Sequence, residues 1–340
     1  MIYYITCLMS GIVELGSVFW GLSQGYAIEK IIGIALAYQL GNILRFFVTP
    51  KMAKYESVWA GIVLLISLII PSLLKYPTIK FFATLIMFAL FSTILQNVRS
   101  SAQGNIPRWQ KRSSRVVGFV LSAVVYVANS YSMIALSALL LFFSLRTDNY
   151  SYDKWLVNWK RGVYGSRVCW SMVTHQAHYF AYNYLLLIIV MNTCKNPLIA
   201  TICFALNWVP YTVTEPLIQK LKWNKWKEIA VCAHIFNAVI LLTMFFVVTQ
   251  NIYFTVALWV LTGFGGGNVF CIKKALVNRI EYNKHVWSFS EQIGHILGVC
   301  SALIVSVLCR ELRFSMVVAA FYALITIPIM LVTMKKRAIR

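Results

Sequence analysis

Ionisable side chains interrupt several of the most apolar stretches of this sequence. Glu14 lies in GIVELGSVFWG, His175 and His178 lie in VTHQAHYFAY, and Glu291 and His295 lie in SFSEQIGHILG. A charged group at the centre of a bilayer-spanning segment costs about 2.5–3.5 kcal/mol on insertion scales. Such residues therefore indicate either a pathway for a solute or a proton, or a polar network that holds helices together.

The spacing of these residues suits proton transfer. His175 and His178 share one helical face, and Tyr182 extends the same stripe. Glu291 and His295 are four residues apart, so they can meet directly and titrate as a pair. Histidine pairs also bind metals, but the apolar segments contain no aspartate, and we predict no metal site. Self-satisfied hydrogen bonds are the structural alternative for each group.

A second set of polar residues is a candidate for contact with a solute. Gln39, Asn42 and Arg45 follow one another at spacings of three, so they share a helical face. Arg45 is a candidate anion-binding or gating residue, with a structural or headgroup contact as the alternative. The remaining candidates are amides able to hydrogen-bond a polar solute: Asn97, Asn207 and Asn268.

A lipid-embedded helical framework has to position these residues. The 340 residues are 60% apolar and only 12% charged, against about a quarter charged in soluble domains. A soluble protein of this size could not bury so much apolar surface. One crossing needs about 20 residues. We predict an all-α polytopic membrane protein with twelve crossings, numbered in order: 3–22, 30–48, 56–74, 78–98, 114–129, 131–146, 166–192, 197–218, 228–249, 252–271, 287–308 and 313–334.

The crossings fall into two groups of six. Residues 1–146 are predicted to form an N-terminal six-helix bundle, and residues 166–340 a C-terminal one. The polar stretch between them, 147–165, is predicted to be a cytoplasmic linker. Trp155 and Trp159 alternate with charges in it, which is typical of a short interfacial helix.

The two halves also share local signals. Pro50 and Pro216 each end an apolar segment before a short basic connection. Asn-Val pairs at 97–98 and 268–269 end the fourth and tenth crossings, and an arginine stands eleven residues after each asparagine. Parallel six-helix repeats are the architecture of a large class of secondary transporters, whose binding sites lie near the membrane midplane.

In topology the chain resembles the major facilitator superfamily. Arg99 and Gln103-Gly104 loosely echo an arginine and a Gln-Gly pair of the family's fourth helix, whereas TPKMAKYESVW lacks the Gly and Asp of its loop signature. The resemblance implies a secondary active transporter that works by alternating access and is coupled to protons. Its solute would be small and polar or amphiphilic: a metabolite, a siderophore or a drug-like compound.

The resemblance also ranks the candidate residues. It implies that the first and seventh crossings line a central cavity, so that Glu14, His175 and His178 would face it. It places the ninth crossing, with His234, at the periphery, so we interpret His234 as an ordinary buried histidine. The glycine-rich run at 263–267 predicts a hinge or a close approach between helices.

Other function classes fit the sequence less well. No phosphate-binding loop is present, because no Lys-Ser or Lys-Thr follows the glycine-rich run, so energy would come from a gradient. A membrane enzyme that uses His175 or His178 as its base would need a denser His, Asp and Glu cluster on a polar loop. We predict no enzymatic activity and no cofactor. A non-transporting sensor or assembly protein with a transporter fold is the third hypothesis.

The net charge of +21 is explained by topology. With the N-terminus inside, 24 of the 31 lysines and arginines fall on the face that holds both termini, and Arg45 lies within a crossing. Six fall on the opposite face: Lys30, Lys75, Lys80, Lys195, Arg310 and Arg313. This is the positive-inside bias, and we predict no nucleic-acid binding. The expected partners are the solute, protons and lipid, around a monomer in the plasma (cytoplasmic, cell inner) membrane.

Both termini are therefore expected in the cytoplasm. A reporter that is active only in the cytoplasm should be active when fused to Arg340, and one that needs export should be inactive there. Active exported reporter at the C-terminus would overturn the topology.

Overall fold

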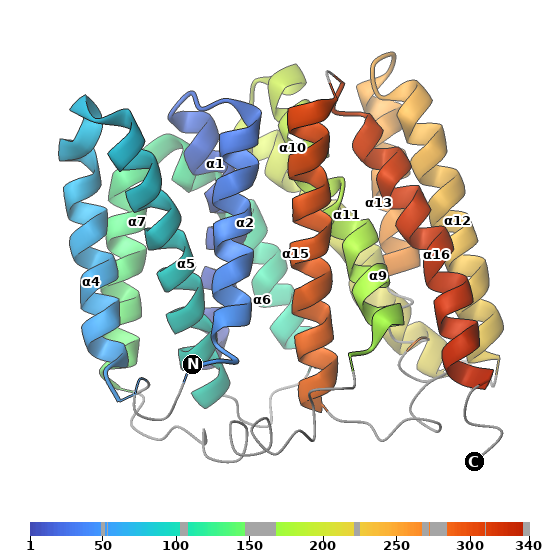
Figure 1. The fold of residues 1–340 in the computed structure, drawn as a ribbon, viewed down its shortest axis with the longest axis horizontal. Coiled ribbons are helices and arrows are strands. Elements are labelled where there is room, and N and C mark those ends of the chain that lie inside the picture. Colours follow the sequence, from blue (N-terminus) through green and yellow to red (C-terminus); the bar gives the residue numbers. More distant parts are fainter. Residues whose placement is uncertain are drawn as a thin grey trace. The chain divides into compact units, whose positions relative to one another are not determined.

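A computed structural model describes residues 1–48, 52, 54–102, 108–146, 168–220, 225–266, 272, 284–309 and 311–335 of the chain. The regular structure of these residues is entirely helical, which confirms the predicted fold class. The chain forms two compact units, Met1–Gly165 and Ser166–Arg340, here named unit 1 and unit 2 (Figure 1). The predicted linker 147–165 and Asn268 lie outside the described residues.

Unit 1 contains the first six crossings. Its helices are α1 (Ile2–Ser23), α2 (Ile28–Leu44), α4 (Glu56–Ile69), the 3-10 helix η1 (Ile70–Lys75), α5 (Pro77–Ser101), α6 (Arg108–Leu121) and α7 (Ala123–Ser144). Inside α7 the backbone of Asn129 leaves the helical path, with φ 39° and ψ −112°. The kink coincides with the predicted end of the fifth crossing, so α7 holds the end of that crossing and the sixth crossing as far as Ser144.

Local sequence explains where these helices begin and end. After α1, Gly25 adopts a left-handed conformation with φ +65°, which glycine accepts because it has no Cβ. The Tyr26 amide donates to the Gly21 carbonyl at 3.1 Å and the Gly25 amide donates to the Leu22 carbonyl at 3.0 Å. This pair of bonds caps the last carbonyls of α1. Pro77 begins α5, where its missing amide proton costs nothing.

Unit 2 contains the last six crossings. Its helices are α9 (Trp170–Phe180), α10 (Asn183–Cys194), α11 (Pro197–Lys220), α12 (Trp226–Val247), α13 (Ile252–Gly266), α15 (Lys284–Leu308) and α16 (Phe314–Lys335). The seventh crossing, predicted as one segment, is built from two helices, α9 and α10, which are separated at Ala181 and Tyr182. Within the described residues, eight helical segments are long and apolar enough to cross a membrane, and one of them is α4 continued by η1.

The helices of the two units pair in the same order. In unit 1, α1 packs on α6, α2 on α5 and α4 on α7; in unit 2, α9 packs on α15, α11 on α13 and α12 on α16. In each unit, therefore, the first crossing pairs with the fifth, the second with the fourth and the third with the sixth. The repeated Pro and Asn-Val signals of the sequence accompany a repeated arrangement of helices.

Glycine allows close backbone contacts in these helix pairs. A Cβ on Gly11 of α1 would lie 2.3 Å from the Arg115 carbonyl oxygen of α6, and one on Gly118 of α6 would lie 2.2 Å from the Leu8 carbonyl oxygen of α1. Helices in lipid associate through such close packing of small residues, because lipid tails are as apolar as the side chains. The equivalent pair in unit 2 uses Gly294 and Gly298 of α15, which approach carbonyls of α9.

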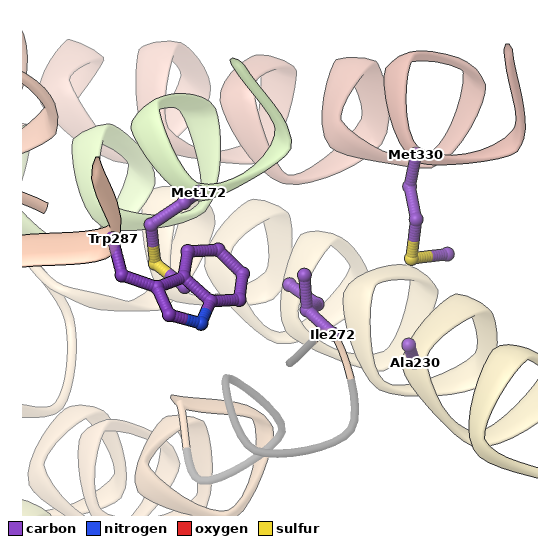
Figure 2. Packing of buried hydrophobic residues seen from close by; sticks show 5 residues of the cluster. All are labelled: Met172, Ala230, Ile272, Trp287 and Met330. Atoms are coloured by element: carbon purple, nitrogen blue, oxygen red, sulfur yellow. The ribbon is translucent and has the colours of Figure 1, made fainter. Parts of the chain in front are cut away.

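The buried apolar residues of unit 2 include a cluster that joins several of its helices. Figure 2 shows its members, which come from α9, α12, α15, α16 and the segment before α15: Met172, Ala230, Ile272, Trp287 and Met330. All are at most 5% exposed. The cluster supports the part of α9 that leads to His175.

Replacing Gly11 should destabilise the protein, whereas replacing Gly61 should not. A Cβ at Gly11 would collide with backbone that cannot rotate away, so Gly11→Ala is expected to cost about 1–3 kcal/mol. Gly61 of α4 has nothing within 4 Å of an added Cβ, so Gly61→Ala should be neutral or stabilising by up to about 1 kcal/mol. Thermal unfolding of both purified variants in detergent measures the difference. Equal melting temperatures would show that the α1–α6 contact tolerates a side chain.

Candidate functional site

Unit 2 contains a two-rung polar ladder between α9 and α12. His175 Nδ1 lies 2.9 Å from His234 Nε2, and His178 Nε2 lies 3.2 Å from Asn237 Nδ2. All four side chains are at most 2% exposed. The rings of the three histidines are close together, with centroids 5.0 to 6.1 Å apart.

The ladder follows from matched spacing on two parallel helices. Each helix contributes two residues at positions i and i+3, and both rungs join residues 59 apart in sequence. Equal separations require α9 and α12 to run in the same direction at this point, as the seventh and ninth crossings of a membrane protein should.

The sequence predicts only a structural role for His234 and no role for Asn237. The signal that could have found them is the shared spacing of HIFN and HQAH. Because the helix with His234 is expected at the periphery, nothing in the sequence links HIFN to HQAH. Only the packing of the helices shows that the two motifs face each other.

The interruption of the seventh crossing is held by a second polar network. The Asn183 side chain donates to the Tyr179 carbonyl at 2.7 Å and accepts from Trp259 Nε1 at 2.6 Å. The Tyr182 and Thr262 hydroxyls are 2.9 Å apart. Side chains near the break therefore form hydrogen bonds with the backbone and with each other. Two of their partners, Trp259 and Thr262, lie on α13 and hold the break in place. Broken helices of this kind form solute and ion sites in many transporters.

Asn207 of α11 belongs to the same network. Its side-chain Oδ1 accepts a hydrogen bond from the Tyr179 hydroxyl at 2.8 Å, and its side-chain Nδ2 donates to Thr262 Oγ1 at 2.9 Å. Close packing of α11 on α13 makes these bonds possible. A Cβ on Gly263 of α13 would lie 2.0 Å from the backbone carbonyl oxygen of Asn207. Tyr182 and Asn207, predicted separately, thus share Thr262 as a partner.

Glu291 and His295 lie on α15, the helix that packs along α9. The His295 ring lies against the Phe180 ring, with centroids 4.0 Å apart and planes tilted by 34°. Glu291 is half-buried. The pair therefore lies on a helix that borders the ladder helix, within the same unit.

In unit 1, Glu14 is 1% exposed and forms an ion pair with Arg115 of α6. The Arg115 side chain is 27% exposed, so the protein encloses the pair only in part. From the sequence alone, Arg115 is expected only to contribute to the positive-inside bias. The structure places it opposite Glu14, near the close contact of α1 and α6 at Gly11 and Gly118.

The predicted polar face of α2 packs against α5. Asn42 donates to Gln39 at 3.0 Å and accepts from Ser92 at 2.9 Å, and Arg45 donates to Gln96 at 3.4 Å. These bonds join α2 to α5. Asn97 is buried on α5, next to Gln96 in sequence and 6% exposed.

The Glu14–Arg115 pair should contribute measurably to stability. Glu14→Leu removes a buried carboxylate from the arginine it contacts, at an expected cost of about 1–3 kcal/mol, less than for a fully buried pair because Arg115 is partly exposed. Glu14→Gln keeps an acceptor and should cost less. The double variant Glu14→Leu/Arg115→Leu should recover part of the loss. Additive losses in a thermal-unfolding cycle would contradict a direct interaction.

Comparison with known proteins identifies the architecture. The chain matches no protein-family model and no curated protein by sequence. Among solved structures, it is similar to the nucleoside transporter NupG, with TM-score 0.61, 15% identity, and coverage of 98% of this chain and 100% of that one.

Two further similar structures are a bacterial metal transporter and a bacterial homologue of the iron transporter ferroportin in its inward-facing state. Their TM-scores are 0.63 and 0.62, each at 10% identity and covering 98% of both chains. Identities this low relate folds and not substrates. Along nearly its whole length, the chain shares the fold of these solved structures.

Proposed function

We propose that this protein is a secondary active transporter that moves a small polar or amphiphilic organic solute by alternating access. The observation that carries the proposal is the interrupted seventh crossing with its polar network, in a transporter fold. Asn183, Tyr182 and Thr262 form hydrogen bonds inside an otherwise apolar helix bundle. A purely structural helix in lipid would be cheaper if it were continuous, because unbroken helices satisfy their own backbone groups.

The chemistry of the polar groups favours an organic solute over a metal ion. The amide and hydroxyl groups of unit 2 can donate and accept hydrogen bonds, which suits a polar solute. In the part of the chain that the structure describes, no group of three or more His, Cys, Asp or Glu residues could hold a metal ion. We propose solute contacts by these residues: Arg45, Asn97, Tyr182, Asn207 and Asn268.

Proton coupling is the second part of the proposal. The acidic and imidazole groups within the crossings can bind a proton in one conformational state and release it in the other. The candidates are Glu14, His175, His178, Glu291 and His295. The two six-helix bundles, 1–146 and 166–340, would move about the linker 147–165, with the monomer in the cytoplasmic membrane and both termini inside.

Reconstitution into liposomes tests the proposal. A panel of nucleosides, iron-chelate compounds, other polar metabolites and divalent metal salts should yield an organic solute whose uptake depends on the protein and on a pH gradient. Protein-dependent uptake of metal ions alone would overturn the organic-solute proposal. Absence of flux for the whole panel would favour a sensor or assembly role.

At least one of Glu14→Gln and Glu291→Gln should abolish gradient-driven accumulation and leave solute exchange largely intact. Glutamine keeps the size and hydrogen bonding of the side chain but cannot titrate. Glu311→Gln is the matched control, because Glu311 is exposed, lies outside the crossings and pairs with Arg313. If both test variants accumulate solute like the wild type from about pH 5.5 to 8, the histidine range, neither carboxyl couples transport.

A further inference from the structure

We propose that His175 and His234 form a proton-binding dyad that takes up a single proton at His175. The site requires only the geometry of unit 2; its use in coupling rests on the proposed function. It assigns the proton to an imidazole pair that spans two helices, and gives His234 a role that its position in sequence does not suggest.

The hydrogen-bond chain fixes the tautomer of both rings. His234 Nδ1 lies 2.6 Å from the Ala230 carbonyl oxygen, which can only accept, so Nδ1 carries the proton. A neutral imidazole has one N–H, so His234 Nε2 is an acceptor. Because Nε2 lies 2.9 Å from His175 Nδ1, that nitrogen is the donor. The nitrogen of His175 that carries no proton in the neutral pair is therefore Nε2.

The same chain sets the stoichiometry. A proton added at His175 Nε2 keeps both hydrogen bonds of the chain, from His175 to His234 and from His234 to Ala230. It also turns the Nδ1–H bond to His234 into a charge-assisted one, which is stronger. A second proton would go to His234 Nε2, and two N–H groups would then face each other across 2.9 Å. The two rings therefore bind one proton as a unit.

The second rung keeps His178 out of the dyad and fixes the register of α12. Asn237 Nδ2 donates to His178 Nε2 at 3.2 Å. Gly265 of α13 backs this amide closely, because a Cβ there would lie 1.9 Å from Asn237 Oδ1. The contact from α13 holds the Asn237 side chain, and with it α12, at the height where His234 meets His175.

The charged and titratable groups around the dyad are few. On α9 the neighbour is His178. On α12, Lys227 and Glu228 are exposed at the helix start. On α15, which packs on α9, the charged groups and histidines are Lys284, His285, Glu291 and His295; α10 and α13 have none of these, and α16 has Lys335, its last residue. The tyrosines and cysteines of these helices are Tyr179 on α9, Tyr184 and Cys194 on α10, Cys232 on α12, Tyr253 on α13, Cys300 on α15 and Tyr322 on α16. Glu291 is the one carboxylate on α15.

The dyad joins the interrupted crossing to a neighbouring helix. His175 lies five residues before the end of α9 at Phe180, and the break follows at Ala181. A bond from His175 to α12 that strengthens on protonation would tie the proton to the position of α9. If the protein transports as proposed, this is a physical link between proton binding and movement of the broken helix.

Nitrogen NMR of the full-length protein, labelled with ¹⁵N at the histidine rings and held in lipid nanodiscs, tests the dyad without any transport assay. The chain has five histidines, so single His→Gln variants assign the signals. At neutral pH, His175 and His234 should both show the Nδ1–H tautomer. On acidification one proton should bind to the pair, with His175 becoming doubly protonated. An Nε2–H tautomer at His234, or uptake of two protons by the pair at one pH, would overturn the proposal.

Two substitutions at His234 sharpen the test. Gln places an acceptor near the position of Nε2, so His234→Gln should retain proton uptake at His175. Leu offers no acceptor. In His234→Leu, half-protonation of His175 should therefore require a proton concentration about tenfold higher or more, as expected for the loss of a hydrogen bond to a charged group. Equal uptake in both variants would overturn the dyad. If His234→Leu does not fold, the tautomers of His175 and His234 in the wild-type protein still test the dyad. If the tautomers are as expected but the liposomes show no solute flux, the result contradicts the transporter proposal and leaves the dyad intact.

Discussion

Hydrocarbon offers no hydrogen-bond partner, so every polar group inside this helix bundle needs a partner from the protein itself. The constraint explains why the polar residues of the crossings occur in sets. Glu14 is matched by Arg115, Asn42 by Gln39 and Ser92, and His175 by His234. Each set joins different helices, so satisfying the polar groups also fixes which helices pack together.

The same constraint explains the glycines. Polar side chains as short as Asn can bridge two helices only if the backbones approach closely, and a Cβ at the contact prevents that. Gly263 lies against Asn207 and Gly265 against the Asn237 amide, so two glycines of one helix each make room for an asparagine of another. The glycine-rich run, interpreted from sequence as a hinge or a close contact, is a close contact at these two positions.

The low sequence identity to solved structures of the same fold is consistent with specific contacts at only a few positions. At 10–15% identity, the structural neighbours share nearly the full length of the chain. Most residues of the crossings need only be apolar and of suitable size, so they vary freely. Specific chemistry is confined to a few satisfied polar sets, and these can differ between proteins without a change of fold.

Sequence alone determined the helical membrane class and the approximate place of the crossings, because apolar length reflects bilayer thickness directly. It also identified Glu14, His175 and Asn207 as unusual, because polarity in an apolar run is visible locally. It could not pair Glu14 with Arg115, join His175 to His234, or find the break at Ala181 and Tyr182. Those features depend on contacts between helices distant in sequence, where helical register and close backbone approach decide which side chains meet.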